Sequence, residues 1–167
     1  LKPTDFKCQP INNEVGCNMG PPVCCQAKDE QGEPGSCDPR AYCPPKCLCS
    51  GTEVRCSHQE FDEIPPFIAL DTTKLFLDVN QIGSLSPDLQ RLTKLTSLDL
   101  SNNKLVSLPE YAFANLTELQ TLIMSYNELQ CIQGNTFAGL ANLRVLSLHG
   151  NDLSSIPYGS FKSLESL

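Results

Sequence analysis

The chain has 167 residues, a formal net charge of −7 and ten cysteines. Its length suits one ordinary domain, or one elongated domain preceded by a tail, and we expect the second. The negative charge argues against general binding to nucleic acid or anionic membranes, because phosphate contacts need clustered cations.

Export is predicted by the cysteine content. Ten cysteines in a chain of this length are typical of disulfide-bonded proteins that are secreted or extracellular. The chain opens with no signal peptide and has no run near the ~20 apolar residues that cross a bilayer. We therefore expect a piece of a longer secreted protein, with no membrane span.

Residues 9–42 are rich in proline and glycine and have no apolar periodicity. This composition predicts a loop-like Cys/Pro/Gly-rich linker. Cysteines at several positions could tether it, and counting leaves their pairing open. The cysteines whose partners stay undetermined are Cys8, Cys17, Cys24 and Cys25.

Residues 43–56 read CPPKCLCSGTEVRC. The spacing C-x3-C-x-C-x6-C does not form two matched C-x2-C pairs, and His58 and His149 each stand alone, so the pattern disfavours zinc. Disulfides are the better interpretation, and we predict no metal and no cofactor. This segment, within residues 43–69, lies where a repeat array needs an N-terminal cap, because an open strand edge invites pairing with other chains.

A repeat begins at residue 70. The strings TKLFLDVNQI, LTSLDLSNNKL, LQTLIMSYNEL and LRVLSLHGNDL follow the leucine-rich repeat pattern L-x-x-L-x-L-x-x-N-x-L. Residues 70–167 therefore hold four repeats, and Leu167 is the first leucine of a fifth, with no C-terminal cysteine cap. The predicted fold is an α/β leucine-rich repeat solenoid, a horseshoe with a parallel concave sheet. Its asparagines, at steps of 23, 24 and 24 residues, are Asn80, Asn103, Asn127 and Asn151.

Two sets of apolar residues should fill this solenoid. An amphipathic helix is excluded because the L-x-L step has period two, so the alternating leucines point inward from short strands. A second set, with the same spacing, should stack beneath the convex loops. The first set is Leu75, Leu77, Leu98, Leu100, Leu122, Met124, Leu146 and Leu148, and the second is Phe113, Phe137 and Phe161 with Leu116, Leu140 and Leu164.

Several strings are more specific than repeat geometry requires. DFKC at residues 5–8, the spacer Cys37-x5-Cys43, LIMSYNELQCI and LRVLSLHGNDLSSIPYGSF together resemble the Slit family of secreted axon-guidance ligands. The resemblance is best to the fourth leucine-rich repeat domain of these proteins. It implies that residues 1–8 are the end of a preceding repeat domain.

This resemblance implies three disulfides: Cys43 with Cys49, Cys47 with Cys56, and Cys37 with Cys131. The third bond is geometrically possible. The six residue steps between Cys43 and Cys37 can span roughly 20 Å when extended, and three or four strand spacings toward Cys131 amount to about 15 to 20 Å. The alternative is that Cys131 is a buried free thiol, which behaves as a small hydrophobe.

No catalytic constellation is present. Ser147, His149 and Asp152 are near in sequence, but hydroxyl and acidic residues are common in a repeat strand and its loop, so we predict a protein that is not an enzyme. The concave face is the better candidate for function, because apolar groups clustered in water mark protein contacts. Its predicted interface residues are Phe76, Val79, Ile123, Tyr126, Val145 and His149.

The Slit resemblance also implies partners. In that family the second domain binds Roundabout receptors, whereas the fourth is implicated in self-association and heparan sulfate binding. We therefore predict homodimerisation through the concave face. Heparan sulfate is less well supported, because the basic residues Arg91, Lys94, Lys104 and Arg144 are few. The alternatives are a generic extracellular repeat module that binds an unrelated protein, and a structural spacer. The sequon at Asn115 predicts N-glycosylation on the convex side.

Overall fold

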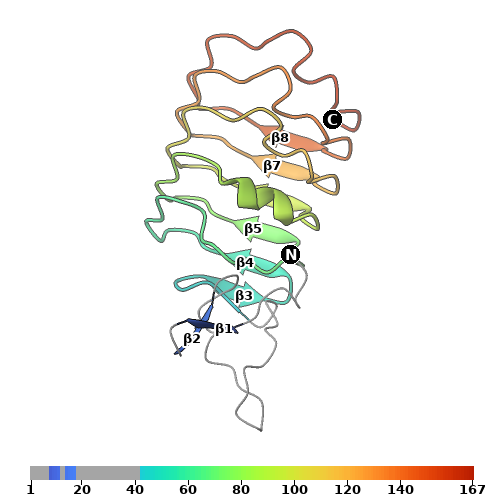
Figure 1. Ribbon diagram of the computed structural model, residues 1–167. Coiled ribbons are helices and arrows are strands. Elements are labelled where there is room, and N and C mark those ends of the chain that lie inside the picture. The colour runs from blue at the N-terminus through green and yellow to red at the C-terminus, as the bar shows by residue number, and fades with distance from the viewer. Residues whose placement is uncertain (1–7, 12–13, 18–41) are drawn as a thin grey trace.

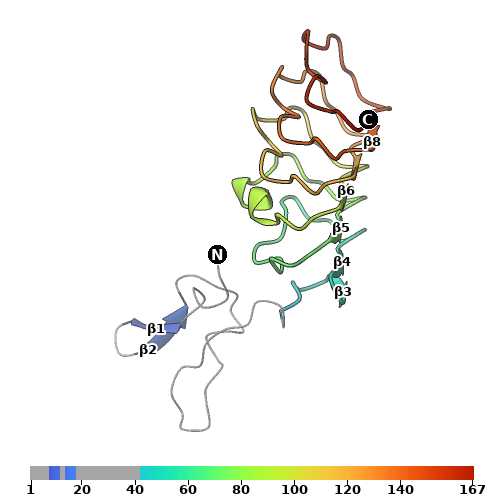
Figure 2. The same cartoon turned by 90° about the vertical axis from the view of Figure 1, so that its right-hand side faces the viewer.

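The computed structural model describes residues 8–11, 14–17 and 42–167 (Figure 1). From residue 42 onward the chain forms a stack of coils, each of which contributes one short strand to a common sheet. Figure 2 shows these strands aligned along one side of the stack. The predicted solenoid with a parallel sheet and a disulfide-bonded cap is confirmed.

Six strands form the sheet, in chain order β3 to β8. β3 (Leu48–Ser50) pairs antiparallel with β4 (Glu53–Arg55), and all later pairs are parallel. The cap therefore supplies the first two strands and covers the edge of the first repeat strand. The four repeat strands are β5 (Lys74–Phe76), β6 (Ser97–Asp99), β7 (Thr121–Ile123) and β8 (Val145–Ser147).

The inward leucines form one continuous core. Leu75, Leu98 and Leu122 are opposite one another in the parallel register and are fully buried. Leu146 and Leu148 of the last coil are only partly buried, because no described residue packs on the outer side of β8. Cap residues such as Val54 and Ile64 belong to the same core, so cap and repeats fold as one unit.

The repeat asparagines link successive coils. Asn103 is buried, and its Nδ2 donates to the carbonyls of Leu77 in the preceding coil and Leu100 in its own, each at 3.0 Å. Its Oδ1 accepts a bond from the backbone N–H of Ile82 at 3.0 Å. The same pattern recurs at Asn127. Each unpaired buried group would cost about 1–3 kcal/mol, so the ladder stabilises the coil stack.

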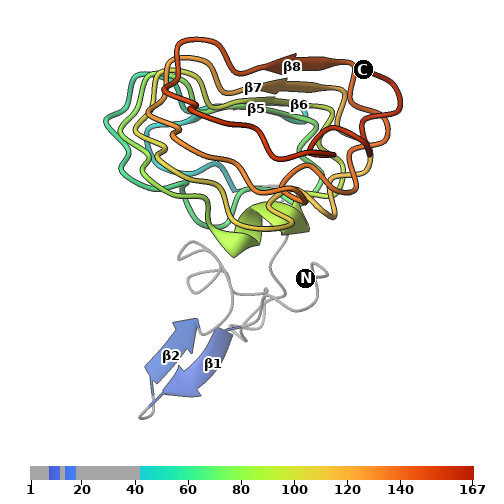
Figure 3. The same ribbon diagram turned by 90° about the horizontal axis from the view of Figure 1, so that it is seen from above.

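The wall opposite the sheet has turns and the 3-10 helix η4 (Pro87–Arg91) (Figure 3). Phe137 stacks between Phe113 and Phe161, with ring centroids 6.2 and 5.8 Å apart. The first coil has no phenylalanine at this position, and buried Leu89 of η4 lies 24 residues before Phe113. The column is therefore continued by a smaller side chain.

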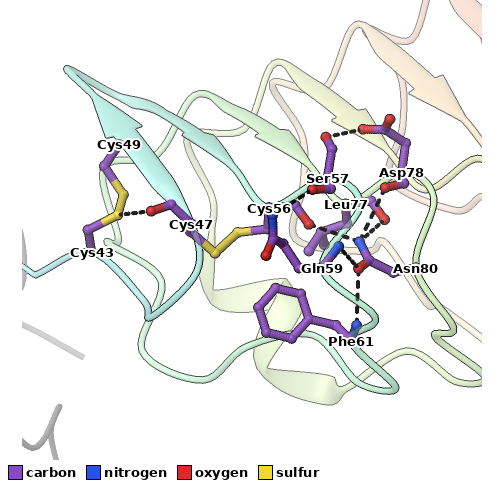
Figure 4. The surroundings of a disulfide bond; sticks show 10 residues. All are labelled: Cys43, Cys47, Cys49, Cys56, Ser57, Gln59, Phe61, Leu77, Asp78 and Asn80. Carbon is purple, nitrogen blue, oxygen red and sulfur yellow. Dashed lines mark hydrogen bonds between the residues drawn. A yellow bond between two sulfur atoms is a disulfide. The ribbon is translucent and has the colours of Figure 1, made fainter.

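Two disulfides hold the cap (Figure 4). Cys43 is bonded to Cys49 and Cys47 to Cys56, the pairs implied by the resemblance to Slit. Cys56 is fully buried, and its N–H donates to the carbonyl of Phe76 at 2.7 Å. Its carbonyl accepts a 2.9 Å bond from Nδ2 of Asn80. The cap is thus joined to the first coil through sulfur, backbone and asparagine.

The structure differs from the predicted linker in one respect. Within residues 9–42, which were expected to be loop-like, β1 (Cys8–Ile11) pairs antiparallel with β2 (Glu14–Cys17). A two-stranded sheet has only edge strands, so it tolerates Pro10 and needs no apolar alternation of its own. The expectation was therefore wrong for these short segments. The pairing of Cys24 and Cys25 concerns residues outside those that the structure describes.

Candidate protein-interaction face

The concave side of the sheet presents side chains in rows that run across the strands. Strand register places Lys74, Ser97, Thr121 and Val145 in one row. The next row contains Phe76, Asp99, Ile123 and Ser147. The strand residues of the predicted interface, Phe76, Ile123 and Val145, lie in these two rows. Because alternate residues of a strand point to opposite faces, the rows lie on the side away from the core leucines.

The predicted apolar column is not continuous. β6 lies between β5 and β7, and it places Asp99 directly between Phe76 and Ile123. Asp99 Oδ1 accepts bonds from the N–H of Ser101 at 2.9 Å and from its hydroxyl at 2.7 Å. Phe76 and Ile123 are two strand spacings apart, about 10 Å. The face therefore has two apolar groups, one on β5 and one on β7 and β8.

The β5 group is largely covered by the cap. The guanidinium of Arg55 lies over the ring of Phe76, 4.3 Å from its centroid. Arg55 is held there by Glu53, with a nitrogen–oxygen distance of 3.2 Å. Phe76 is therefore engaged within the fold, and only Val79 of this group is exposed. The sequence did not predict this contact, because nothing in the repeat pattern indicates that the cap extends the sheet.

The second group, here called the β7–β8 patch, consists of Ile123, Tyr126, Val145 and His149. Tyr126 is 56% exposed and Val145 is 47% exposed. The rings of Tyr126 and His149 meet edge to face, with centroids 4.9 Å apart. Ile123 and Val145 extend this face along β7 and β8 from the aromatic pair. Aromatic residues of this kind are enriched in protein interfaces. The structure thus brings together four of the six predicted interface residues.

Gly150 makes room for this patch. Its φ is +71°, and a Cβ atom built there would lie 2.5 Å from Cδ1 of Tyr126. Val79, Asn102 and Tyr126 have positive φ at the matching position of the earlier coils. At Gly150 the ring of Tyr126 from the preceding coil occupies the space that a Cβ would take. The glycine just before the repeat asparagine is the sequence signal that could have indicated this contact.

The polar groups nearby do not form a catalytic site. Ser147 Oγ lies 2.9 Å from Nδ1 of His149, on an open face. Within residues 42–167, no hydrogen bond or ion pair joins the Asp152 side chain to His149, so this carboxylate does not orient the imidazole ring. In the described part of the chain, no group of three His, Cys, Asp or Glu residues could hold a metal ion. Among the described residues, the Ser147–His149 pair therefore has no carboxylate partner of the kind that orients a catalytic histidine.

Cys131 lies on the side of the coils, in isolated parallel bridges with Ser107 and Ser155. It is a free thiol among the described residues, and its side chain is exposed. The alternative of a buried thiol is therefore wrong, because position 131 faces outward between two coils. Its expected partner Cys37 lies outside the described residues, so the Cys37–Cys131 bond stays a prediction.

The basic residues considered for heparan sulfate are mostly paired. Lys94 contacts Glu118 at 3.7 Å and Lys104 contacts Glu128 at 3.4 Å, each across neighbouring coils. Arg91 lies 3.7 Å from Asp88 within η4. Their carboxylate neighbours reduce the positive potential that a sulfated chain would need.

The repeats match a known family. Residues 72–129 and 125–167 match the leucine rich repeat family. The chain belongs to the leucine-rich repeat family. Leucine-rich repeat domains are typically protein-interaction modules. Among the part of the chain that is described, no helix is both long and apolar enough to span a bilayer.

Similar leucine-rich repeat proteins include leucine-rich repeat-containing protein 52 of Homo sapiens, 40% identical over 72 residues, which are 42% of this chain and 23% of that protein. The Mus musculus counterpart is 40% identical over 76 residues, 44% of this chain and 24% of that protein. Leucine-rich repeat-containing protein 3B of Bos taurus is 40% identical over 77 residues, 44% of this chain and 30% of that protein. The matches thus span less than a third of each relative, and the names specify no enzyme activity.

Proposed function

We propose that this leucine-rich repeat chain acts outside the cell, where its β7–β8 patch binds a protein surface. The observation that carries the proposal is the exposed aromatic pair of Tyr126 and His149, with ring centroids 4.9 Å apart, on the same sheet face as Ile123 and Val145. Tyr126 is 56% exposed, although it could bury a large aromatic surface in a contact. Burial of such anchors supplies most of the binding free energy in protein interfaces.

The occupant that we favour is a second copy of the chain. A two-fold contact needs only one self-complementary patch, and paired β7–β8 patches would align apolar and aromatic groups from both copies. The resemblance to the fourth repeat domain of Slit supports the same assignment. In the parent protein, binding to Roundabout-type receptors would then use other domains.

A second candidate is an unrelated protein partner, because leucine-rich repeat domains are typically protein-interaction modules. Heparan sulfate is the weakest ligand, because three of the four basic residues considered are paired with carboxylates. An extracellular location is supported by the two cap disulfides, which persist in oxidising compartments.

A glycan fits this arrangement. Asn115 carries the sequon and is exposed on the convex side, away from the strands. A sugar attached there would leave the β7–β8 patch open.

The test is the mass of the chain in solution. We expect the wild-type protein to form a dimer at ~100 µM, and Ile123→Asp or Tyr126→Asp to give monomers, because each would bury an unpaired charge. Analytical ultracentrifugation measures this mass. Asn102→Asp is the matched control, because Asn102 is exposed on the same face but belongs to the polar β6 coil.

If the wild-type chain is a dimer and both patch variants are dimers too, the β7–β8 patch is not the dimer contact. If the wild-type chain is itself monomeric, self-association is excluded and the unrelated partner becomes the favoured occupant.

A further inference from the structure

A second candidate surface lies on the convex side, between the cap and the first coil. The segment 63–70 and the segment 84–92 enclose a groove of about 470 Å³. η4 forms part of one wall, and Figure 3 shows η4 on the side opposite the sheet. The groove is therefore remote from the β7–β8 patch and offers an independent binding position.

The base of the groove is apolar and already packed. Ile64 and Ile68 from the cap, and Leu89 and Leu92 from the first coil, line it and are each at least nine-tenths buried. η4 is held by Ser86, whose Oγ accepts a bond from the N–H of Asp88 at 3.2 Å. Both walls belong to the common core, so a ligand would meet a preformed surface.

Phe67 stands at the open side of the groove. It lines the groove, is 39% exposed and has a φ of +62°. A bulky side chain rarely adopts this left-handed conformation, because Cβ crowds the following carbonyl. Strained residues of this kind gather at ligand-binding positions. With this backbone conformation, the Phe67 ring lies beside the apolar base of the groove and outside the core.

The charged side chains that line the groove are Glu63, Asp88 and Arg91, so the lining carries a formal net charge of −1. On the opposite wall Arg91 is matched by Asp88 at 3.7 Å. Among the described residues, Glu63 makes no ion pair of 4.0 Å or less and remains available at the rim. Charge complementarity therefore selects a cationic ligand.

We propose that this groove binds a short extended peptide segment of a partner protein, with one bulky apolar side chain seated against Phe67 and Leu89. Lysine or arginine residues that flank this anchor would lie beside Glu63. An open groove with an apolar base and a charged rim fits a peptide, because the anchor is buried while the flanks stay in water.

The experiment uses the full chain and defined probes. Fluorescent ten-residue peptides with a central leucine or phenylalanine and two lysines on each side are titrated against the protein, beside twins with glutamate in place of lysine. We expect the lysine peptides to bind and the glutamate twins to bind roughly tenfold more weakly or less. Glu63→Lys should reverse this preference.

Phe67→Gly is the decisive variant. Glycine accepts a φ of +62° without strain, so the backbone conformation should be kept while the ring is lost. We expect this change to weaken peptide binding by about tenfold or more, as removal of an aromatic anchor does. Tyr111→Gly is the matched control, because Tyr111 is also exposed, aromatic and in a left-handed conformation but does not line the groove.

Three results would overturn the proposal: no binding of any peptide in the panel, equal binding by Phe67→Gly and Tyr111→Gly, or equal affinity for the lysine and glutamate peptides. Decanoate is added as a competitor. Tight binding of decanoate without peptide binding would make the groove a site for a small apolar molecule. None of these results depends on dimerisation through the β7–β8 patch, which is measured separately.

Discussion

At the scale of single residues, a few contacts between coils determine what the concave face presents. Tyr126 lies across the position that a side chain at residue 150 would occupy. Arg55 covers Phe76 and so removes it from the exposed surface. The exposed apolar area of the face therefore depends on which residues are apolar and on how far neighbouring side chains cover them.

The first prediction concerns Gly150→Ala. The added Cβ would meet the near part of the Tyr126 ring, at 2.5 Å from Cδ1 and 3.2 Å from Cγ, so the whole ring must move. We expect a loss of about 2–4 kcal/mol in the free energy of unfolding, from overpacking together with an unfavourable φ. Urea unfolding measures it.

The control is Gly51→Ala, where φ is +58° but no atom lies within 4 Å of the new Cβ. This change should cost only about 1–2 kcal/mol, the conformational part. Adding Tyr126→Ala to Gly150→Ala should recover about 1–2 kcal/mol of coupling. Strict additivity of the two changes would show that the ring and the glycine do not compete for space.

At the scale of elements, the cap and the strands act together. β4 pairs in parallel with β5, so the cap strand extends the repeat sheet and protects its first edge. The two disulfides differ in their surroundings: Cys56 is fully buried, whereas Cys49 is exposed. The Cys47–Cys56 bond therefore anchors the cap to the core, and the Cys43–Cys49 bond closes a surface loop.

The second prediction compares these bonds by paired serine substitutions. With sequence separations of 9 and 6, loop closure alone contributes roughly 2.6 and 2.2 kcal/mol, nearly the same. A serine hydroxyl at buried position 56 adds a further cost of about 1–3 kcal/mol. We expect Cys47→Ser with Cys56→Ser to destabilise the chain more than Cys43→Ser with Cys49→Ser, by about 1–3 kcal/mol in urea unfolding.

The reverse order of stability, or equal losses, would contradict the assignment of Cys56 as the core anchor. Near-ultraviolet circular dichroism of both variants checks that the repeats remain folded.

At the scale of the whole molecule, each coil contacts mainly its neighbours. The free energy of unfolding of such an array is close to the sum of the contributions of single repeats and of the interfaces between neighbours. A covalent link between distant segments would add a contribution that lies outside this sum. The predicted Cys37–Cys131 bond would be such a link. It would tie the linker to the side of the third repeat, where Cys131 lies between Ser107 and Ser155.

The third prediction is that Cys131 of the oxidised, full chain is joined to Cys37. The exposed position of Cys131 makes it accessible to a partner sulfur. Iodoacetamide without reductant should then leave Cys131 unlabelled, and peptide mapping should recover the linked pair. Labelling after reduction is the control. Labelling of Cys131 before reduction would exclude the bond.

The sequence by itself determined the repeating coil and the residues that fill its interior. Its 23- to 24-residue period determined the inward leucines, the phenylalanine stack and the asparagine ladder, because each depends on spacing that recurs locally. The same period indicated which positions lie on the concave face, but the predicted interface did not include the interruption of its apolar residues by Asp99 of β6.

Only the tertiary structure decided which of these residues are free to bind. The cover of Arg55 over Phe76, the space that Gly150 leaves for Tyr126 and the groove beside Phe67 each join residues from different coils. Such contacts depend on the packing of side chains across coils, and a repeat consensus does not encode that packing. The physical reason is that spacing determines which positions are adjacent, whereas side-chain size and backbone conformation determine what remains exposed.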